Sequence, residues 1–149
     1  CLSSLESHFF FNFTKINSRM IQRIQTLYLF AAAILSALSA FFMPLYSLEG
    51  VSYAATAHAE SFGGFGACMA IFSGSILLYS NRKRQLLVVR LGMLTSLIIL
   101  GYIIYLIQGN GAEASWGAAV PFFLVVLSYM ASKNIQKDET KVRSLDRLR

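Results

Sequence analysis

Charged residues are scarce in this chain, and those present are confined to a few short segments. Only 13% of the 149 residues are Asp, Glu, Lys or Arg, and 56% are hydrophobic, whereas about a quarter of a soluble domain is charged. Histidine and cysteine number two each; Cys1 lies in the N-terminal segment before Met20 and Cys68 lies in an apolar run, so the two cysteines do not indicate a disulfide framework. This composition indicates a single-domain membrane protein rather than a soluble one.

Long apolar runs account for the missing charge. A membrane-spanning helix needs roughly 20 apolar residues, and four runs qualify, at about 27–46, 62–79, 86–107 and 115–131. Arg90 is their only charged residue, and it lies near an end, where an arginine can reach back to the membrane surface. Because the runs are apolar on all sides, they predict membrane helices rather than a soluble four-helix bundle.

The connections between these runs set the expected architecture. The links at 80–85 and 108–114 are short, and residues 47–61 form a longer loop. Short links force neighbouring helices to run antiparallel. We therefore predict an all-α membrane protein with four transmembrane helices in an up-down-up-down arrangement.

Lys and Arg are distributed on one side of this arrangement. All thirteen lie before the first run, in or just after the link 80–85, or after the fourth run, whereas the other two connections hold Glu49, Glu60 and Glu113. Positive residues mark cytoplasmic segments, so both termini are expected in the cytoplasm. Because topology explains the basic balance, nucleic acid is not expected as a partner; the lipid bilayer is.

Two stretches near the ends of the chain resemble a known family. They are MIQRIQTLYLFAAAIL at 20–35 and KDETKVRSLDRLR at 137–149, and they accompany the four runs and the basic link NRKRQ. Together they resemble a family of small bacterial inner-membrane proteins described as a domain of unknown function. The resemblance covers residues 20–149 and implies a four-helix protein of the cell inner (plasma) membrane. It implies no activity, cofactor or catalytic residue.

The ends of the chain differ from the part between them. Residues 1–19 precede Met20, a plausible start, and we expect a non-native or disordered leader there; a lipidated Cys1 would have to lie outside the cell, against the charge rule. Residues 20–132 are expected to form the transmembrane domain. Residues 133–149 form a charged tail, predicted to be a short cytoplasmic amphipathic helix that continues from the fourth run or starts just after it. In this tail Glu139 precedes Arg143 by four residues, the favourable order for a helical ion pair.

The search for chemistry finds no catalytic, cofactor-binding or metal-binding residue to propose. His58 and Glu60 are fewer than the three or four ligands that a metal usually needs, so a solvated loop is preferred there. Cys68 is expected to be a small packing residue, and the glycines at 63–66 lack the Lys-Ser/Thr of a phosphate-binding loop. We therefore do not expect an enzyme.

Two sets of residues are candidates for contacts. Charges at the cytoplasmic side are candidates for binding lipid or a partner; they are Arg82, Lys83, Arg84, Arg90, Glu139, Arg143, Asp146 and Arg147. Small residues at helical spacing allow close helix packing in lipid; they are Ala32, Ser36, Ala40, Gly66, Ala70, Gly74, Gly92 and Ser96. Packing within the bundle and docking to another membrane protein, or to a second copy, both fit the second set.

These features favour a non-catalytic membrane protein, such as a subunit, an assembly factor or an envelope component. The alternative is a small transporter or channel protomer, which would need a polar path that the spans hardly offer. The sequence does not indicate a substrate, a partner or an oligomeric state.

Overall fold

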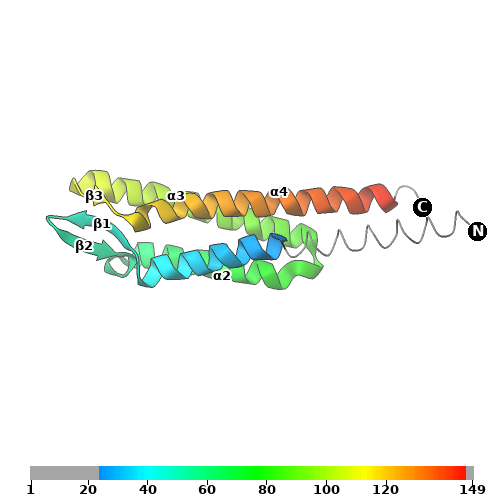
Figure 1. Cartoon of the computed structure of the whole chain (residues 1–149), viewed down its shortest axis with the longest axis horizontal. Helices are drawn as coiled ribbons and strands as arrows, with labels where there is room; N and C mark the ends of the chain where they lie inside the picture. The colour runs from blue at the N-terminus through cyan, green and yellow to red at the C-terminus, as the bar shows by residue number, and fades with distance from the viewer. Residues whose placement is uncertain (1–23, 147–149) are drawn as a thin grey trace, which may run out of the picture.

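The computed structural model describes residues 24–146, and helices dominate them (Figure 1). The first helix is Ile24–Phe41, followed by α2 (Ala59–Leu77), α3 (Arg82–Asn110) and α4 (Val120–Asp146). All four are long and apolar enough to cross a membrane. The prediction of four membrane-spanning helices is therefore confirmed.

A small antiparallel sheet caps one end of the bundle (Figure 1). It contains β1 (Pro44–Leu48), β2 (Val51–Ala54) and β3 (Glu113–Ala114), in the order β2-β1-β3. Strands are not expected here from the sequence, in which residues 44–46 belong to the first apolar run and residues 47–61 to a loop. The purely α-helical expectation is thus corrected at this end of the molecule.

Local chain chemistry explains the β1–β2 hairpin. Leu48 pairs with Val51, so Glu49 and Gly50 form a two-residue turn, and both have positive φ, at 51° and 83°. Such turns match the twist of the flanking strands, but they normally carry Asn-Gly or Asp-Gly. Because Glu-Gly is not one of these usual pairs, the sequence indicates the hairpin turn only weakly.

The two prolines mark boundaries of elements rather than bends. The first helix ends at Phe41, ahead of the Tyr46 boundary expected from hydropathy, and Pro44 starts β1, a strand position where its missing N–H is tolerated. Pro121 was expected inside a span, but α4 begins at Val120. In that first turn the absent N–H breaks no helical hydrogen bond, so no bend is required.

The helices pack through narrow stripes with alternating spacings of four and three residues. This period is typical of helices that cross at shallow angles. On α2 the stripe is Ser61, Phe65, Cys68, Phe72 and Ser75; on α3 it is Gln85, Val89, Gly92, Ser96, Ile99 and Ile103. The buried residues Gln25, Leu29, Ala32, Ser36 and Ser39 repeat it on the first helix, as do Leu124, Ser128, Ala131, Ile135 and Asp138 on α4.

Outside these stripes the helices are apolar and exposed. Leu97, Ile98 and Ile104 on α3 and Phe122 and Phe123 on α4 are between 42% and 72% exposed. Large apolar side chains outside the packing stripes are expected when the surroundings are lipid, since lipid chains are as apolar as leucine. The chain is therefore a multi-pass membrane protein.

Candidate functional site

The end of the bundle opposite the sheet gathers the basic residues. The start of α3 supplies Arg82, Lys83 and Arg84, and its first turn contains no acidic residue. Asn81 caps this helix, with its Oδ1 accepting a hydrogen bond from the Arg84 N–H at 3.5 Å. Three cations at a helix N-terminus oppose the helix dipole, so helix stability does not explain why they are there.

One of these cations is neutralised by α4. Arg82 Nη1 lies 2.7 Å from Asp138 Oδ2, and the two side chains are 27% and 4% exposed. Neither atom makes a hydrogen bond to another described group, so each charge is the other's main compensation. The ion pair joins the start of α3 to the end of α4.

Asp138 belongs to the charged tail but is not among the contact residues predicted from the sequence. It lies three residues after Ile135 and seven after Ala131, on the buried stripe of α4. In the sequence, this burial is indicated only by the spacing, which places an acidic residue on the same side of the helix as buried apolar residues. The many charges of residues 133–149 indicate a surface segment, whereas α4 remains buried on one side as far as Asp138.

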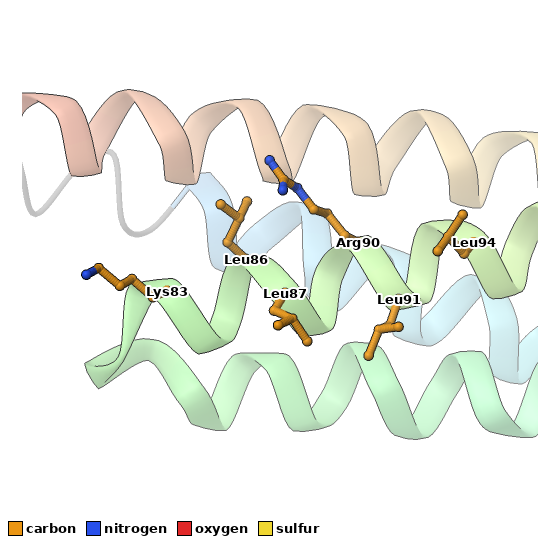
Figure 2. Close-up of a pocket in the computed structure, with 6 residues that line it drawn as sticks. All are labelled: Lys83, Leu86, Leu87, Arg90, Leu91 and Leu94. Carbon is orange, nitrogen blue, oxygen red and sulfur yellow. The ribbon is translucent and has the colours of Figure 1, made fainter.

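Three other basic residues of α3 are exposed. Lys83, Arg84 and Arg90 make no ion pair within residues 24–146. Lys83 and Arg90 border a groove of about 290 Å³ on the surface of α3 (Figure 2). Leucines complete its lining: Leu86, Leu87, Leu91 and Leu94.

The predicted tail contacts are only partly within the described structure. Residues 133–146 continue α4 in line with the bundle, and no separate amphipathic helix follows within the described residues (Figure 1). Glu139 is half-buried. The side chains of Arg143 and Asp146, and the whole of Arg147, lie outside the described part of the chain.

The small-residue stripes separate into an inner and an outer group. Ala32, Ser36, Ala40, Gly92 and Ser96 are buried. A Cβ on Gly92 would lie 2.7 Å from the Phe72 ring, which shows how closely α3 approaches α2.

The small residues predicted for packing on α2 form the outer group. Gly66 and Ala70 are exposed, Gly74 is half-buried, and both glycines have open space beside them. The α2–α3 contact instead uses Gly64, where a Cβ would lie 2.9 Å from Ile99. A spacing of four residues alone could not reveal which side of α2 faces inward.

A second polar cluster lies at the sheet end. The buried Tyr46 hydroxyl hydrogen-bonds His58 Nε2, and the Tyr46 and Tyr53 rings stack with centroids 5.2 Å apart. Burial, with a smaller effect of Tyr53, raises the pKa of Tyr46. The Tyr102 hydroxyl donates to Glu60 at 3.3 Å. His58 and Glu60 therefore have partners; Glu60 is exposed, and it lies in the first turn of α2 rather than in a loop.

Neither cluster has the composition of a metal centre or a nucleophilic site. No group of three or more His, Cys, Asp or Glu side chains gathers among residues 24–146. The Cys68 thiol is buried, with its Sγ 3.5 Å from Ser96 Oγ. What these groups can do is hold helices together and, at the basic end, attract anions.

Comparison with known proteins identifies a family but no activity. Residues 21–148 match the family model described as "Domain of unknown function (DUF4293)". No curated protein and no solved structure is detectably similar.

Proposed function

Since this chain belongs to the DUF4293 family, whose description carries no function, we propose a role from the arrangement of its own residues. The protein is a non-catalytic component of the cell inner membrane, serving as a subunit, an assembly factor or an envelope component. Its four helices cross the membrane in alternating directions, with both termini in the cytoplasm. The filled interior of the bundle is the observation that carries this proposal.

The interior supports an anchor rather than a conducting protomer. Phe65, Phe72, Ile103 and Leu124 are fully buried on the packing stripes. Four buried serines bond their own helix, as when Ser128 donates to the Leu124 carbonyl at 2.7 Å. Within residues 24–146 the buried Ser39 and Ser61 hydroxyls and the Gln25 amide nitrogen have no hydrogen-bond partner, but they lie near the ends of their helices and do not form a continuous polar path through the bundle. A substrate path needs polar groups free to bind the substrate, and hydroxyls that satisfy their own backbone do not supply them.

Charge segregation supports the orientation. Glu49, Glu60 and Glu113 belong to the elements around the sheet, which contain no Lys or Arg between residues 42 and 81 or between 111 and 119. The basic residues at the start of α3 lie at the opposite end (Figure 1). A cytoplasmic basic end follows from the positive-inside rule.

Purification of the full chain in mild detergent tests the role. We expect another membrane protein to co-purify in stoichiometric amount. The matched variant exchanges Glu139→Arg and Arg143→Glu, which preserves composition, net charge and an opposite-charge pair four residues apart. If the tail recognises a partner by its charge pattern, this exchange weakens co-purification without affecting insertion, because like charges at an interface oppose binding.

Reconstitution into liposomes distinguishes the alternative. A transporter or channel protomer would produce solute or ion flux from the pure protein alone. Flux without any partner would contradict the proposed role, as would a purified chain that remains monomeric and partner-free under conditions that preserve its helices.

A further inference from the structure

We propose that the groove on α3 binds the headgroup phosphate of an anionic phospholipid, with the lipid chains lying along its leucines. Placing this lipid in the cytoplasmic leaflet rests on the orientation proposed above. The binding itself does not, since it depends only on the residues that line the groove. Those residues are Lys83, Leu86, Leu87, Arg90, Leu91 and Leu94.

The lining residues all come from one face of one helix. Their spacings of three, four and seven residues place them in successive turns of α3. Lys83 and Arg90 are two turns apart, which corresponds to about 10.5 Å of axial rise. The groove therefore runs along the helix axis, in the direction in which a lipid lies in the bilayer.

The two cations are available for a ligand. Arg82 is paired with Asp138, whereas Lys83 and Arg90 are exposed and make no ion pair within the described residues. In Figure 2 the Arg90 side chain runs back along α3 toward the end that carries Lys83. This is the natural direction for a helical side chain, and it brings the guanidinium toward the membrane border, where it can form charge-assisted hydrogen bonds to a phosphate.

The leucines decide between a lipid and a soluble anion. Leu87, Leu91 and Leu94 are 60%, 49% and 54% exposed. Leu87 lies between the two cations, whereas Leu91 and Leu94 extend the groove beyond Arg90 toward the middle of α3. A free phosphate would bind the cations and leave these side chains uncovered. A phospholipid matches both parts, since its phosphate and its chains are joined in the same order. An anionic headgroup is favoured because it brings no ammonium group to compete with Lys83 and Arg90 for the phosphate.

Native mass spectrometry of the full chain in mild detergent tests the site. Phosphatidylglycerol and phosphatidylcholine with identical acyl chains are added separately, and inorganic phosphate is added as a competitor. The double variant Lys83→Gln/Arg90→Gln removes both cations of the groove. The control, Lys133→Gln/Lys137→Gln, removes the same charge from exposed positions on α4.

We expect the natural chain to prefer phosphatidylglycerol, and the groove variant to bind it on the order of tenfold or more weakly. The control should stay within about twofold, and millimolar phosphate should displace little lipid. Lys83→Gln alone, in the exposed first turn of α3, should weaken binding about fivefold, and provides the test if the double variant does not accumulate.

Three results would overturn the proposal. Equal losses in the groove variant and the control would indicate general attraction to the basic end. Equal binding of both lipids would remove the role of the cations, and efficient displacement by inorganic phosphate would indicate a soluble anion. Since binding is measured in detergent, none of these results bears on the proposed membrane orientation or on a protein partner.

Discussion

At the scale of single residues, the Arg82–Asp138 ion pair is the feature that most constrains the basic end. The carboxylate is almost fully buried on the packing stripe of α4, and its partner comes from the first turn of α3. Removing one member of such a pair leaves an uncompensated charge, which is more damaging than removing both. The pair therefore specifies how the two helices align at this end.

Arg82→Gln should destabilise the folded protein by about 2–3 kcal/mol, somewhat less than for a fully buried pair because Arg82 is partly exposed. Arg84→Gln is the control, because it removes the same charge at a position two residues later in the chain. The Arg84 side chain is exposed and makes no ion pair among the described residues. Thermal unfolding in detergent measures both. The double variant Arg82→Gln/Asp138→Asn should recover part of the loss, and equal effects of the two single variants would show that the pair contributes nothing specific.

Gly117 is the glycine whose replacement the fold tolerates least. A Cβ there would lie 2.5 Å from the Pro44 carbonyl oxygen, and backbone atoms cannot move aside as a flexible side chain can. We expect Gly117→Ala to lower the free energy of unfolding by about 1–3 kcal/mol through overpacking. Gly101→Ala is the control, because that exposed helical position has open space and alanine favours helix there. A Gly117→Ala protein as stable as Gly101→Ala would contradict the close packing of η3 (Trp116–Ala119) on β1.

At the scale of secondary-structure elements, the small sheet ties together two connections that are far apart in sequence. β1 follows the first helix, and it pairs both with β2 and with β3, which lies between α3 and α4. The Ser115 N–H also donates to the Leu45 carbonyl at 3.1 Å. Two helical hairpins that also contact through the Tyr102–Glu60 and Cys68–Ser96 hydrogen bonds are thereby joined by backbone hydrogen bonds at one end.

Tyr46→Phe should weaken this sheet by about 0.5–1.5 kcal/mol, because the hydrogen bond to His58 is lost while the ring stays in place. Tyr53→Phe preserves the stacked pair and is the control. Hydrogen exchange of the β1 and β2 amides reports the difference. Similar protection in the natural chain and in Tyr46→Phe would show that the Tyr46–His58 contact does not stabilise the sheet.

The same tyrosine predicts an alkaline dependence. Its folded pKa is raised above the ordinary value of 10.0, so above about pH 10 the folded state holds a proton that the unfolded state has released. Stability must then fall as the pH rises through this range. Tyr46→Phe should remove part of that fall, which unfolding measurements between pH 9 and 11 would detect.

At the scale of the whole molecule, charge and apolar surface divide the protein along its long axis. The helices present apolar side chains outward between a basic end and an end that bears acidic residues. The sheet lies at the second of these ends (Figure 1). The exposed Trp116, beside the sheet, suits a membrane border, where amphipathic rings prefer to lie. The molecule thus has the polarity expected of a protein with a fixed orientation in the bilayer.

Reporter fusions test that orientation. A reporter active only in the cytoplasm should work after Arg149 or after Asn81 and fail after Gly50 or after Asn110. A reporter active only outside the cytoplasm should give the opposite pattern. The Gly50 and Asn110 positions lie at the sheet end, in the β1–β2 turn and at the end of α3. Cytoplasmic activity after Asn110 would contradict the four-span topology.

The sequence by itself determined the number of helices, their membrane character and the separation of charge. Long apolar runs and clusters of Lys and Arg are local features of the chain, so they do not depend on how the helices pack. Only the tertiary structure decided which side of each helix faces inward. Gly66 and Gly92 look alike in sequence, yet one is exposed and the other lies against Phe72. The sheet, the Arg82–Asp138 pair and the groove on α3 likewise depend on which distant segments meet. The physical reason is that lipid-facing and bundle-facing surfaces of a membrane helix are both apolar, so hydropathy alone does not distinguish them.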